Sequence, residues 1–389
     1  MHRRFILILV VLPYCTAHAT EPPRLPTAAP ASVGLDANHL DKIDGVVRQG
    51  LDQHQLPGAV VEVVHRGKVV FRRAYGFRSL EPTKTPMTAD TVFDLASLTK
   101  PLATATSAMI LIEQGKLRLA DPVAHYWPAF GAHGKAKITV EELFLHTSGL
   151  VPDNPVRDYR QGKARALEHI AALTPEAPPG KRFRYSDVNY IVLGQLVERL
   201  SGQTLDTFAR THIYQPLGLS ETTFLPGPAL RQRAAPTEKR NGHWLVGEVH
   251  DPRAALLGGV AGHAGLFSTA DDMVVLAQMF LDGGTYAGKR ILQPATVQLM
   301  TKPRRVPAGF RALGWDVQTA YSSNRGTFPF GSYGHTGFTG TSLWIDPATQ
   351  TAIIILSNRV HPNGKGDLRR LRGRIATIVV ESIRPMPGS

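Results

Sequence analysis

The stretch FDLASLTK, from Phe93 to Lys100, runs directly into the apolar segment PLATATSAMILIEQG. Ser97 and Lys100 are three positions apart, so a helix that begins here places both side chains on one face, one turn apart. A serine hydroxyl is a weak nucleophile at neutral pH, and a neighbouring amine that has lost its proton can activate it. The N-terminus of such a helix also directs unpaired N–H groups toward a developing oxyanion. The stretch therefore predicts a nucleophile beside a base.

Two later stretches add groups that such chemistry needs. Tyr185-Ser186-Asp187 lies between a proline-glycine turn and an expected helix, and His335-Thr336-Gly337 precedes a pattern typical of a strand. Each is weak alone. A Ser-x-x-Lys pair occurs by chance about once in a chain of this length. A buried tyrosine is ordinarily a core residue, and His335 taken singly is ordinarily structural. Only their combination is specific.

The composition is that of a globular protein. The chain has 389 residues, of which 43% are hydrophobic and 19% charged, enough for a large core and a cleft between subdomains. The formal net charge of +13 favours acidic partners, namely anionic polymers, carboxylate-bearing substrates or membrane surfaces. Nucleic acid is not expected as a partner, because the basic residues are scattered and no nucleic-acid-binding motif accompanies them.

The N-terminus has the features of an export signal. A basic start is followed by an apolar run from Phe5 to Leu12 and by an Ala-x-Ala end at Ala19, which predicts a signal peptide over residues 1–19. We expect a periplasmic or secreted mature protein, peripheral to the cell envelope, and an uncleaved membrane anchor is the alternative. The single cysteine, Cys15, lies in this segment, so no disulfide is expected. The proline- and alanine-rich residues 20–34 predict a flexible leader.

The order of secondary-structure patterns predicts one sheet formed from both ends of the chain. A helix precedes a hairpin near the N-terminus, the middle is largely helical, and strands followed by a basic amphipathic helix close the chain. We interpret the arginines of that last helix as a solvated face. One unit is expected over 35–389, with a sheet subdomain from 35–96 and 305–389 and a mainly helical subdomain from 97–304.

Taken together, Ser-x-x-Lys, Tyr-Ser-Asp and His-Thr-Gly resemble in order and spacing the motifs of the serine β-lactamase and penicillin-binding-protein superfamily, in its class C-like branch. That branch includes class C β-lactamases, D-alanyl-D-alanine carboxypeptidases, D-aminopeptidases and esterases. The segments LFLHTSGL at 143–150 and GGVAGHAGLFSTADDM at 258–273 add to the resemblance. It implies an α/β fold of the α+β type, with an antiparallel sheet flanked by helices, a helical subdomain, and the site between them.

The resemblance also implies a role for each residue of the motifs. Ser97 would be the nucleophile, Lys100 its partner in taking the proton, and Tyr185 the group that passes this proton to the leaving group. The oxyanion hole would consist of the N–H groups of Ser97 and Phe338. The remaining substrate-binding residues would be His335, Thr336, Gly337 and Asp187.

Two positions depart from the β-lactamase pattern. Asp187 stands where those enzymes have asparagine, so an acceptor replaces a group that can donate to a substrate amide. His335 stands where they usually have lysine, which makes a permanent positive charge pH-dependent. If His335 must be protonated to hold a carboxylate, affinity should fall between about pH 6 and 8. Both departures argue against efficient β-lactam hydrolysis, and histidine is familiar in the peptidase and esterase members.

Four acidic and histidine residues in the middle of the chain raise the alternative of a metal site. Glu248, His250, Asp251 and His263 could ligate a metal, but their spacing matches no zinc signature. We therefore expect no metal and no cofactor, and interpret His250-Asp251 and His263 as residues that hold a loop at the border of the cleft.

The leading hypothesis is an exported serine hydrolase that works through an acyl-enzyme. Its expected activity is that of a D-alanyl-D-alanine carboxypeptidase or D-amino-acid peptidase on small peptides or muropeptides derived from peptidoglycan. A carboxylesterase, or a weak class C-type β-lactamase acting on β-lactams, is the alternative on the same site. A non-catalytic envelope binding protein is the alternative of another class.

Overall fold

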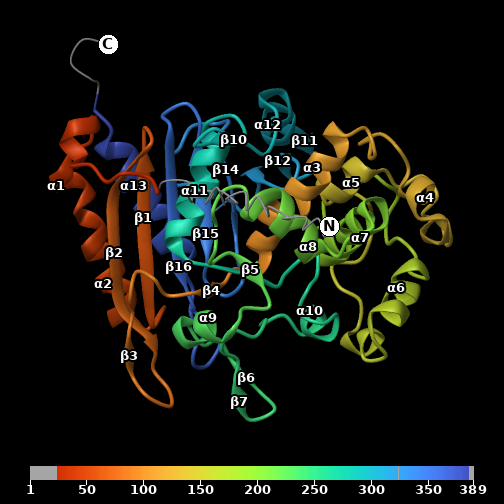
Figure 1. The fold of residues 1–389 in the computed structure, drawn as a ribbon, viewed down its shortest axis with the longest axis horizontal. Coiled ribbons are helices and arrows are strands. Elements are labelled where there is room, and N and C mark those ends of the chain that lie inside the picture. Colours follow the sequence, from red (N-terminus) through yellow and green to blue (C-terminus); the bar gives the residue numbers. More distant parts are fainter. Residues whose placement is uncertain (1–23, 323, 385–389) are drawn as a thin grey trace, which may run out of the picture.

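A computed structural model describes residues 24–322 and 324–384 (Figure 1). Its central feature is a nine-stranded antiparallel sheet, in which the strands from the two ends of the chain lie next to each other. The expected signal peptide lies outside the described residues. The strands, in sheet order, are β11 (Arg304–Val306), β12 (Gly309–Arg311), β13 (Asp316–Gln318), β14 (Tyr333–Thr336), β15 (Ser342–Asp346), β16 (Thr351–Ser357), β1 (Gly58–His65), β2 (Lys68–Ser79) and β3 (Thr85–Pro86).

The expected hairpin is confirmed as β1 and β2, whose β-branched residues suit a pleated strand. β1 also pairs with β16, with Val60 opposite Leu356 and Val63 opposite Ile353. Every residue of β1 and of β16 is buried, because helices cover both faces of the sheet at this point. The junction between the two ends of the chain is therefore the centre of the fold.

Two layers of helices enclose the sheet (Figure 1). On one face lie α1 (Ala37–Leu40), α2 (Lys42–Asp52) and α13 (Arg369–Ser382), which form a compact apolar cluster with β1 and β16. On the other face α11 (Ala270–Leu281) packs against β16, β1 and β15. The α/β fold with a large antiparallel sheet is thus confirmed.

The remaining helices come from the middle of the chain, and two of them have clear end signals. Thr139 forms a capping box with Glu142 at the start of α5, and Gly202 ends α7 with a φ of 71°. These helices are α3 (Thr106–Glu113), α4 (Val123–Tyr126), α5 (Val140–Phe144), α6 (Lys163–Ala171), α7 (Asp187–Ser201), α8 (Leu205–Ala209), α9 (Pro228–Arg233), α10 (Pro252–Leu256) and α12 (Pro294–Thr301).

Short strands complete this part of the chain. β4 and β5 flank β8 in a small sheet beneath the site, and two further hairpins lie at the surface. Their bounds are β4 (Phe93–Asp94), β5 (Thr223–Phe224), β6 (Lys239–Arg240), β7 (His243–Trp244), β8 (Leu266–Ser268), β9 (Thr285–Tyr286) and β10 (Lys289–Arg290).

The flexible leader expected over residues 20–34 is wrong for its described part, residues 24–34. The main chain there bonds to the start of β2: the N–H of Ala28 donates to the carbonyl of Val69 at 3.0 Å, and the N–H of Val69 donates to Pro26 at 3.0 Å. Leu25 is buried in the core, and a 3₁₀ turn follows at Pro30–Val33. The segment satisfies the open edge of β2, which is why it is held in place.

Candidate active site

The turn that carries Ser97 is held by a buried carboxylate. Asp94, at the end of β4, accepts hydrogen bonds from the N–H of Ala96 at 2.8 Å and from the N–H of His250 at 2.7 Å. Ala96 adopts a left-handed φ of 46°, an unfavourable conformation for a residue with a Cβ. Such strain persists only where the surroundings enforce it, and it often accompanies a functional site. Asp94 therefore fixes the orientation of the turn that carries Ser97.

The helix expected after this turn is present but is less regular than predicted. Ser97 lies in a 3₁₀ turn at Ala96–Leu98, a π-helical stretch follows at Lys100–Ala105, and only then does α3 begin. Ser97 and Lys100 still lie one turn apart, as predicted, and the Lys100 ammonium donates to the Ser97 hydroxyl at 2.9 Å. The π-helical stretch, a form frequent at functional sites, coincides with this pair.

Lys100 is completely buried among polar groups. Besides Ser97, its Nζ donates to the main-chain carbonyl of His263 at 3.0 Å and forms an ion pair with Asp187 at 2.7 Å. Burial is the largest single effect and lowers the pKa of Lys100, but Asp187 and Tyr185 together outweigh it and raise the pKa to about 12. The neutral amine predicted beside Ser97 is therefore wrong for the resting site, where Lys100 is an ammonium.

Tyr185 completes the group around the nucleophile. Its ring centroid is 5.0 Å from the Lys100 Nζ, and the ring stacks on His146 at 4.4 Å. The Nδ1 of His146 accepts a hydrogen bond from the N–H of Ser186 at 3.1 Å, which holds Tyr185 at the start of α7. Burial raises the pKa of the Tyr185 hydroxyl, although the charge of Lys100 opposes this shift. Tyr185 is thus a neutral phenol, able to donate a proton.

A cavity of about 410 Å³ opens beside Ser97. Its walls include six of the eight predicted site residues, while Lys100 and Asp187 form their ion pair next to Ser97 without lining it. These six predicted residues are Ser97, Tyr185, His335, Thr336, Gly337 and Phe338. The structure therefore brings together all three motifs, which lie far apart in the sequence. The roles of the individual residues stay predictions.

The two expected oxyanion donors face no competing acceptor. The N–H groups of Ser97 and Phe338 donate no hydrogen bond to another residue within 24–322 and 324–384. Gly337 allows the close approach of chains that places Phe338, because a Cβ there would lie 2.1 Å from the Thr341 hydroxyl and 2.4 Å from the Leu95 carbonyl. These two N–H groups are free to bind a carbonyl oxygen at Ser97.

His335 lies in the cavity as a neutral side chain. Burial lowers its pKa well below the usual value, and the nearby charges of Arg311 and Lys100 lower it further. Its Nδ1 lies 2.9 Å from the carbonyl of Thr336, so this nitrogen carries the proton. The predicted loss of a His335 charge between about pH 6 and 8 is therefore wrong, because that charge is already absent at neutral pH.

Arginine supplies the positive charge instead, at a position that the sequence motifs do not include. Arg311, at the end of β12, is 1% exposed and lines the cavity. Its Nη1 lies 3.6 Å from Asp316, but its Nε and Nη2 have no hydrogen-bond partner among the described residues. No motif marks Arg311, because its place depends on how β12 pairs with β13. A buried guanidinium with free donors is a receptor for a carboxylate.

Arg372 is a second missed residue, and its interpretation as part of a solvated face is wrong. It is 6% exposed, and its Nη2 donates to the carbonyl of Thr341 at 2.9 Å. Arg369, Arg370 and Arg374 are exposed, as expected for that face. The overlooked signal is helical spacing: Arg372 falls on the buried stripe of α13 together with Leu368, Ile375 and Val379.

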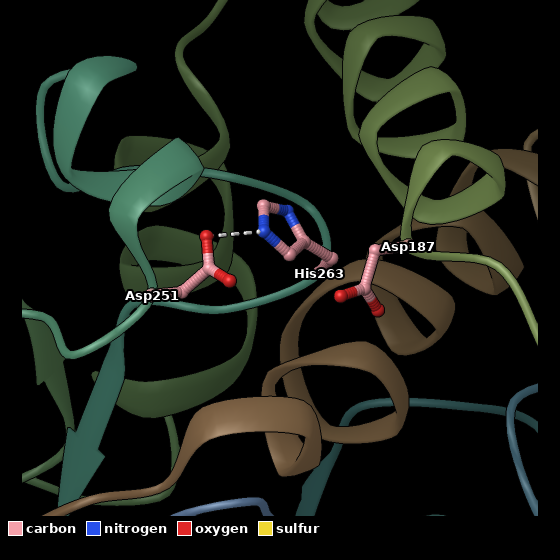
Figure 2. A group of neighbouring side chains, drawn as sticks. All are labelled: Asp187, Asp251 and His263. Atoms are coloured by element: carbon pink, nitrogen blue, oxygen red, sulfur yellow. Dashed lines mark hydrogen bonds and ion pairs between the residues drawn. The ribbon is translucent and has the colours of Figure 1, made fainter. Parts of the chain in front are cut away.

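Two carboxylates and a histidine form a cluster that includes Asp187, the ion-pair partner of Lys100 (Figure 2). Asp187, Asp251 and His263 bring ligand-type atoms within 4.8 Å of one another, a set that differs from the one weighed in the sequence. The Nε2 of His263 contacts Asp251 at 2.9 Å. Asp187 is already paired with an ammonium, whose charge opposes a metal ion there. The cluster is therefore an ion-pair network, and we assign no metal to it.

The other two residues weighed as ligands point elsewhere. Glu248 contacts His243 at 3.4 Å, and His250 contacts Glu238. The contact between Asp251 and His263 instead holds the loop that contains His263, whose main-chain carbonyl accepts a hydrogen bond from Lys100. This agrees with the role in holding a loop that was expected for Asp251 and His263.

The fold and the site together define a serine hydrolase of the β-lactamase type. Residues 43–377 match the model of the Beta-lactamase family, and the chain belongs to this family. The resemblance seen in the motifs is thereby confirmed.

The proteins similar to this chain carry different names. The chain is 35% identical over 401 residues to a protein of Salmonella schwarzengrund (strain CVM19633) named "Putative D-alanyl-D-alanine carboxypeptidase", with 92% of each chain covered. The solved structure of "EstCE1, a hydrolase with promiscuous acyltransferase activity" is 26% identical with a TM-score of 0.70, covering 90% of this chain and 99% of that one. The class C β-lactamase from Rhodobacter sphaeroides shares the fold, with 23% identity, a TM-score of 0.70 and coverage of 88% and 99%.

Proposed function

We propose that this protein is a D-alanyl-D-alanine carboxypeptidase that acts on peptidoglycan-derived peptides through an acyl-enzyme on Ser97. The observation that carries the proposal is the buried Arg311 with free Nε and Nη2 donors, in the same cavity as Ser97. A carboxypeptidase must bind the free carboxylate of the residue that it removes, whereas an esterase acting on simple esters has no such need. The 35% identity to a protein named for this activity supports the same assignment.

Removal of the Ser97 proton requires a base, and Lys100 begins as an ammonium. Ser97, Lys100 and Asp187 form a continuous chain, with 2.9 Å between Ser97 and Lys100 and 2.7 Å between Lys100 and Asp187. In the proposed acylation step Lys100 gives one proton to Asp187 as it takes the proton of Ser97. The Ser97 oxygen then attacks the peptide carbonyl, whose oxyanion the N–H groups of Ser97 and Phe338 stabilise.

Tyr185 serves the leaving group in this scheme. The C–N bond breaks as the Tyr185 hydroxyl donates its proton to the departing D-alanine nitrogen, and a proton from Lys100 restores the phenol. The ring of Tyr185 lies 6.0 Å from that of His335, so the leaving group and its carboxylate are expected on the side of His335 and Arg311. Hydrolysis of the Ser97 ester by water completes the cycle.

The test compares three substrates of the purified mature protein. The first is diacetyl-L-lysyl-D-alanyl-D-alanine, the second is its C-terminal amide, and the third is a short p-nitrophenyl ester. Release of D-alanine from the free acid and little release from the amide is the expected result. Hydrolysis of the ester without hydrolysis of either peptide would refute the carboxypeptidase assignment.

A carboxylesterase is the second candidate. The Phe338 side chain at the mouth of the cavity is 60% exposed and offers an apolar surface to an acyl or alkyl group, and the solved hydrolase EstCE1 is 26% identical. Ester and β-lactam turnover measured beside peptide turnover decides between the candidates, since all three use the same nucleophile.

We further propose that the mature protein is periplasmic or secreted. The proposal rests on the signal-peptide pattern of residues 1–19 and on the peptidoglycan substrate. Among the described residues no helix combines the length and apolar character required to span a bilayer. Cell fractionation, together with N-terminal sequencing of the exported protein, tests both the location and the cleavage after Ala19.

A further inference from the structure

The cavity beside Ser97 carries positive charge at two separate places. Arg311 comes from the end of β12, whereas Arg359 follows β16 and Arg372 lies on α13. Four arginines and two aspartates line the cavity, so its walls hold an excess of two positive charges with His335 neutral. A single substrate carboxylate can neutralise only one of these two places.

The two aspartates leave hydrogen-bond donors of these arginines unsatisfied, although the charge of Asp367 acts favourably on Arg359 and Arg372. Asp367 is engaged by Arg369, whose Nε lies 3.1 Å from Oδ1 and whose Nη2 lies 2.8 Å from Oδ2. Asp316 is 3.6 Å from one nitrogen of Arg311. Among the described residues, the Nε and Nη2 of Arg311 and the Nε of Arg372 are buried without a hydrogen-bond partner. Buried donors of this kind are costly unless a ligand satisfies them.

Arg359 and Arg372 also repel each other. Burial lowers the pKa of Arg372 to about 9, and the charge of Arg359 contributes to that shift. Arg359 is itself half-buried, with its Nη1 donating to the Gly366 carbonyl at 2.6 Å and its guanidinium carbon 4.6 Å from the centre of the Phe338 ring. A bound anion between the two guanidinium groups would relieve this repulsion.

We propose that Arg359 and Arg372 bind a second carboxylate, carried by the acyl-donor part of the substrate, while Arg311 binds the C-terminal carboxylate. The substrate class is thus a dianionic peptide with an acidic residue before its D-alanyl-D-alanine end. This proposal rests on the proposed carboxypeptidase function. The acyl-donor side is assigned because the leaving group lies toward Tyr185 and His335, whereas Arg359 lies beside Phe338, the expected oxyanion donor.

The test uses peptides that differ only in one charge. Acetyl-L-glutamyl-D-alanyl-D-alanine and acetyl-L-glutaminyl-D-alanyl-D-alanine have nearly the same shape, and a second pair carries L-alanine between the variable residue and the D-alanyl-D-alanine end. In at least one pair the kcat/KM of the glutamyl peptide should be about tenfold higher than that of the glutaminyl peptide, chiefly because its KM is lower. Arg359→Gln should reduce that ratio to about one.

Arg370→Gln is the matched control. Arg370 is exposed on α13, the helix that carries Arg372, and does not line the cavity. This variant therefore loses the same charge and should keep the full preference for the acidic peptide. A merely structural role of Arg359 would lower kcat/KM for both members of a pair equally and leave their ratio unchanged. That result, or equal turnover of acid and amide by the wild type in both pairs, overturns the proposal.

An ester pair separates this proposal from the proposed function. Mono-p-nitrophenyl adipate carries a carboxylate on its acyl part, and its methyl ester does not. If no peptide releases D-alanine, the carboxypeptidase assignment fails, but a preference for the adipate monoanion that Arg359→Gln removes still supports the second anion site. No preference in the ester pair or in the peptide pairs contradicts the site.

Discussion

Lys100 owes its charge to Asp187, and this one residue changes the chemistry open to Ser97. With asparagine at that position only Tyr185 would oppose the burial of Lys100, and the balance would shift toward a neutral amine. With aspartate the resting lysine is an ammonium, and in the proposed mechanism the two residues act together as the base. The departure from the β-lactamase pattern at Asp187 would then change how the proton leaves Ser97.

Replacement of Asp187 tests this relay. In Asp187→Asn, kcat/KM for the peptide should fall by about a hundredfold at neutral pH, because the proton acceptor is lost. The residual activity should rise with pH between about 8 and 10, since burial now lowers the pKa of Lys100 and the neutral amine becomes accessible. The measurement is kcat/KM against pH for both proteins, with thermal unfolding to show that the variant folds. Superimposable profiles would rule out a role of Asp187 as acceptor.

Arg311 supplies the charge that His335 lacks. Arg311→Gln should raise KM for peptides with a free C-terminal carboxylate by about ten- to a hundredfold and leave turnover of uncharged p-nitrophenyl esters nearly unchanged. For the wild type, KM for the carboxylate peptide should stay flat between about pH 6 and 8, because His335 is already neutral there. A KM that rises across this range would show that a protonated His335 takes part in binding.

At the scale of elements, the loop between α10 and β8 is as important as the helix that carries Ser97. Its Gly262 packs so closely on α7 that a Cβ would lie 1.9 Å from the carbonyl of Tyr190. The Thr104 hydroxyl donates to the Gly262 carbonyl at 2.7 Å, and the next residue, His263, provides the carbonyl that holds Lys100. The position of the lysine thus depends on the contact between this loop and the helices beneath it.

Gly262→Ala should therefore damage both stability and activity. The added methyl group must displace main chain, which typically costs about 1–3 kcal/mol in the free energy of unfolding, and the shift of His263 should lower kcat more than KM. Gly227→Ala is the control, since Gly227 has a φ of −73° and a Cβ added there would have no other atom within 4 Å. Urea unfolding and peptide kinetics of both variants check the prediction. Equal behaviour of the two would contradict it.

Elements with strong local signals were predictable from sequence. The hairpin of β1 and β2 follows from its β-branched runs, and α7 follows from a serine N-cap and from Gly202 at its end. Residues 24–34, the described part of the leader, could not be predicted in this way. Their main chain pairs with the start of β2, and the composition of the segment gives no sign of that contact. The π-helical start at Lys100 likewise depends on packing and not on local preference.

At the scale of the whole molecule, the motifs predicted which residues meet at the site. They did not predict the charge states of those residues. Resemblance to a family placed Ser97, Tyr185 and His335 together, and the fold does bring them to one cavity. The charge states follow from tertiary neighbours that no motif contains. Lys100 is held charged by Asp187, and His335 is kept neutral by its burial and by Arg311.

The sheet itself contains a titrating group. Glu62 in β1 is completely buried, and its Oε1 accepts a hydrogen bond from Arg72 at 2.9 Å. Burial, with a contribution from the charge of Asp271, raises the pKa of Glu62 to about 7. The folded state therefore holds this proton at pH values where the unfolded chain has lost it. The contribution of Glu62 to stability falls as the pH rises from about 4.5 to 7.

Glu62→Gln should remove this dependence. The wild type should lose about 2 kcal/mol of unfolding free energy between about pH 5 and 8 relative to the variant, because glutamine keeps the shape and does not titrate. Urea unfolding of both proteins at the two pH values gives the difference. Parallel changes in the two proteins would show that Glu62 titrates normally in the fold.

The central claim is that Ser97 cleaves a peptide that ends in a free D-alanine carboxylate. The most direct measurement is D-alanine release from diacetyl-L-lysyl-D-alanyl-D-alanine by the wild type and by Ser97→Ala. We predict release by the wild type and a loss of about ten-thousandfold or more in the variant. Equal release by both proteins, or no release by a wild type that still hydrolyses p-nitrophenyl esters, would contradict the account.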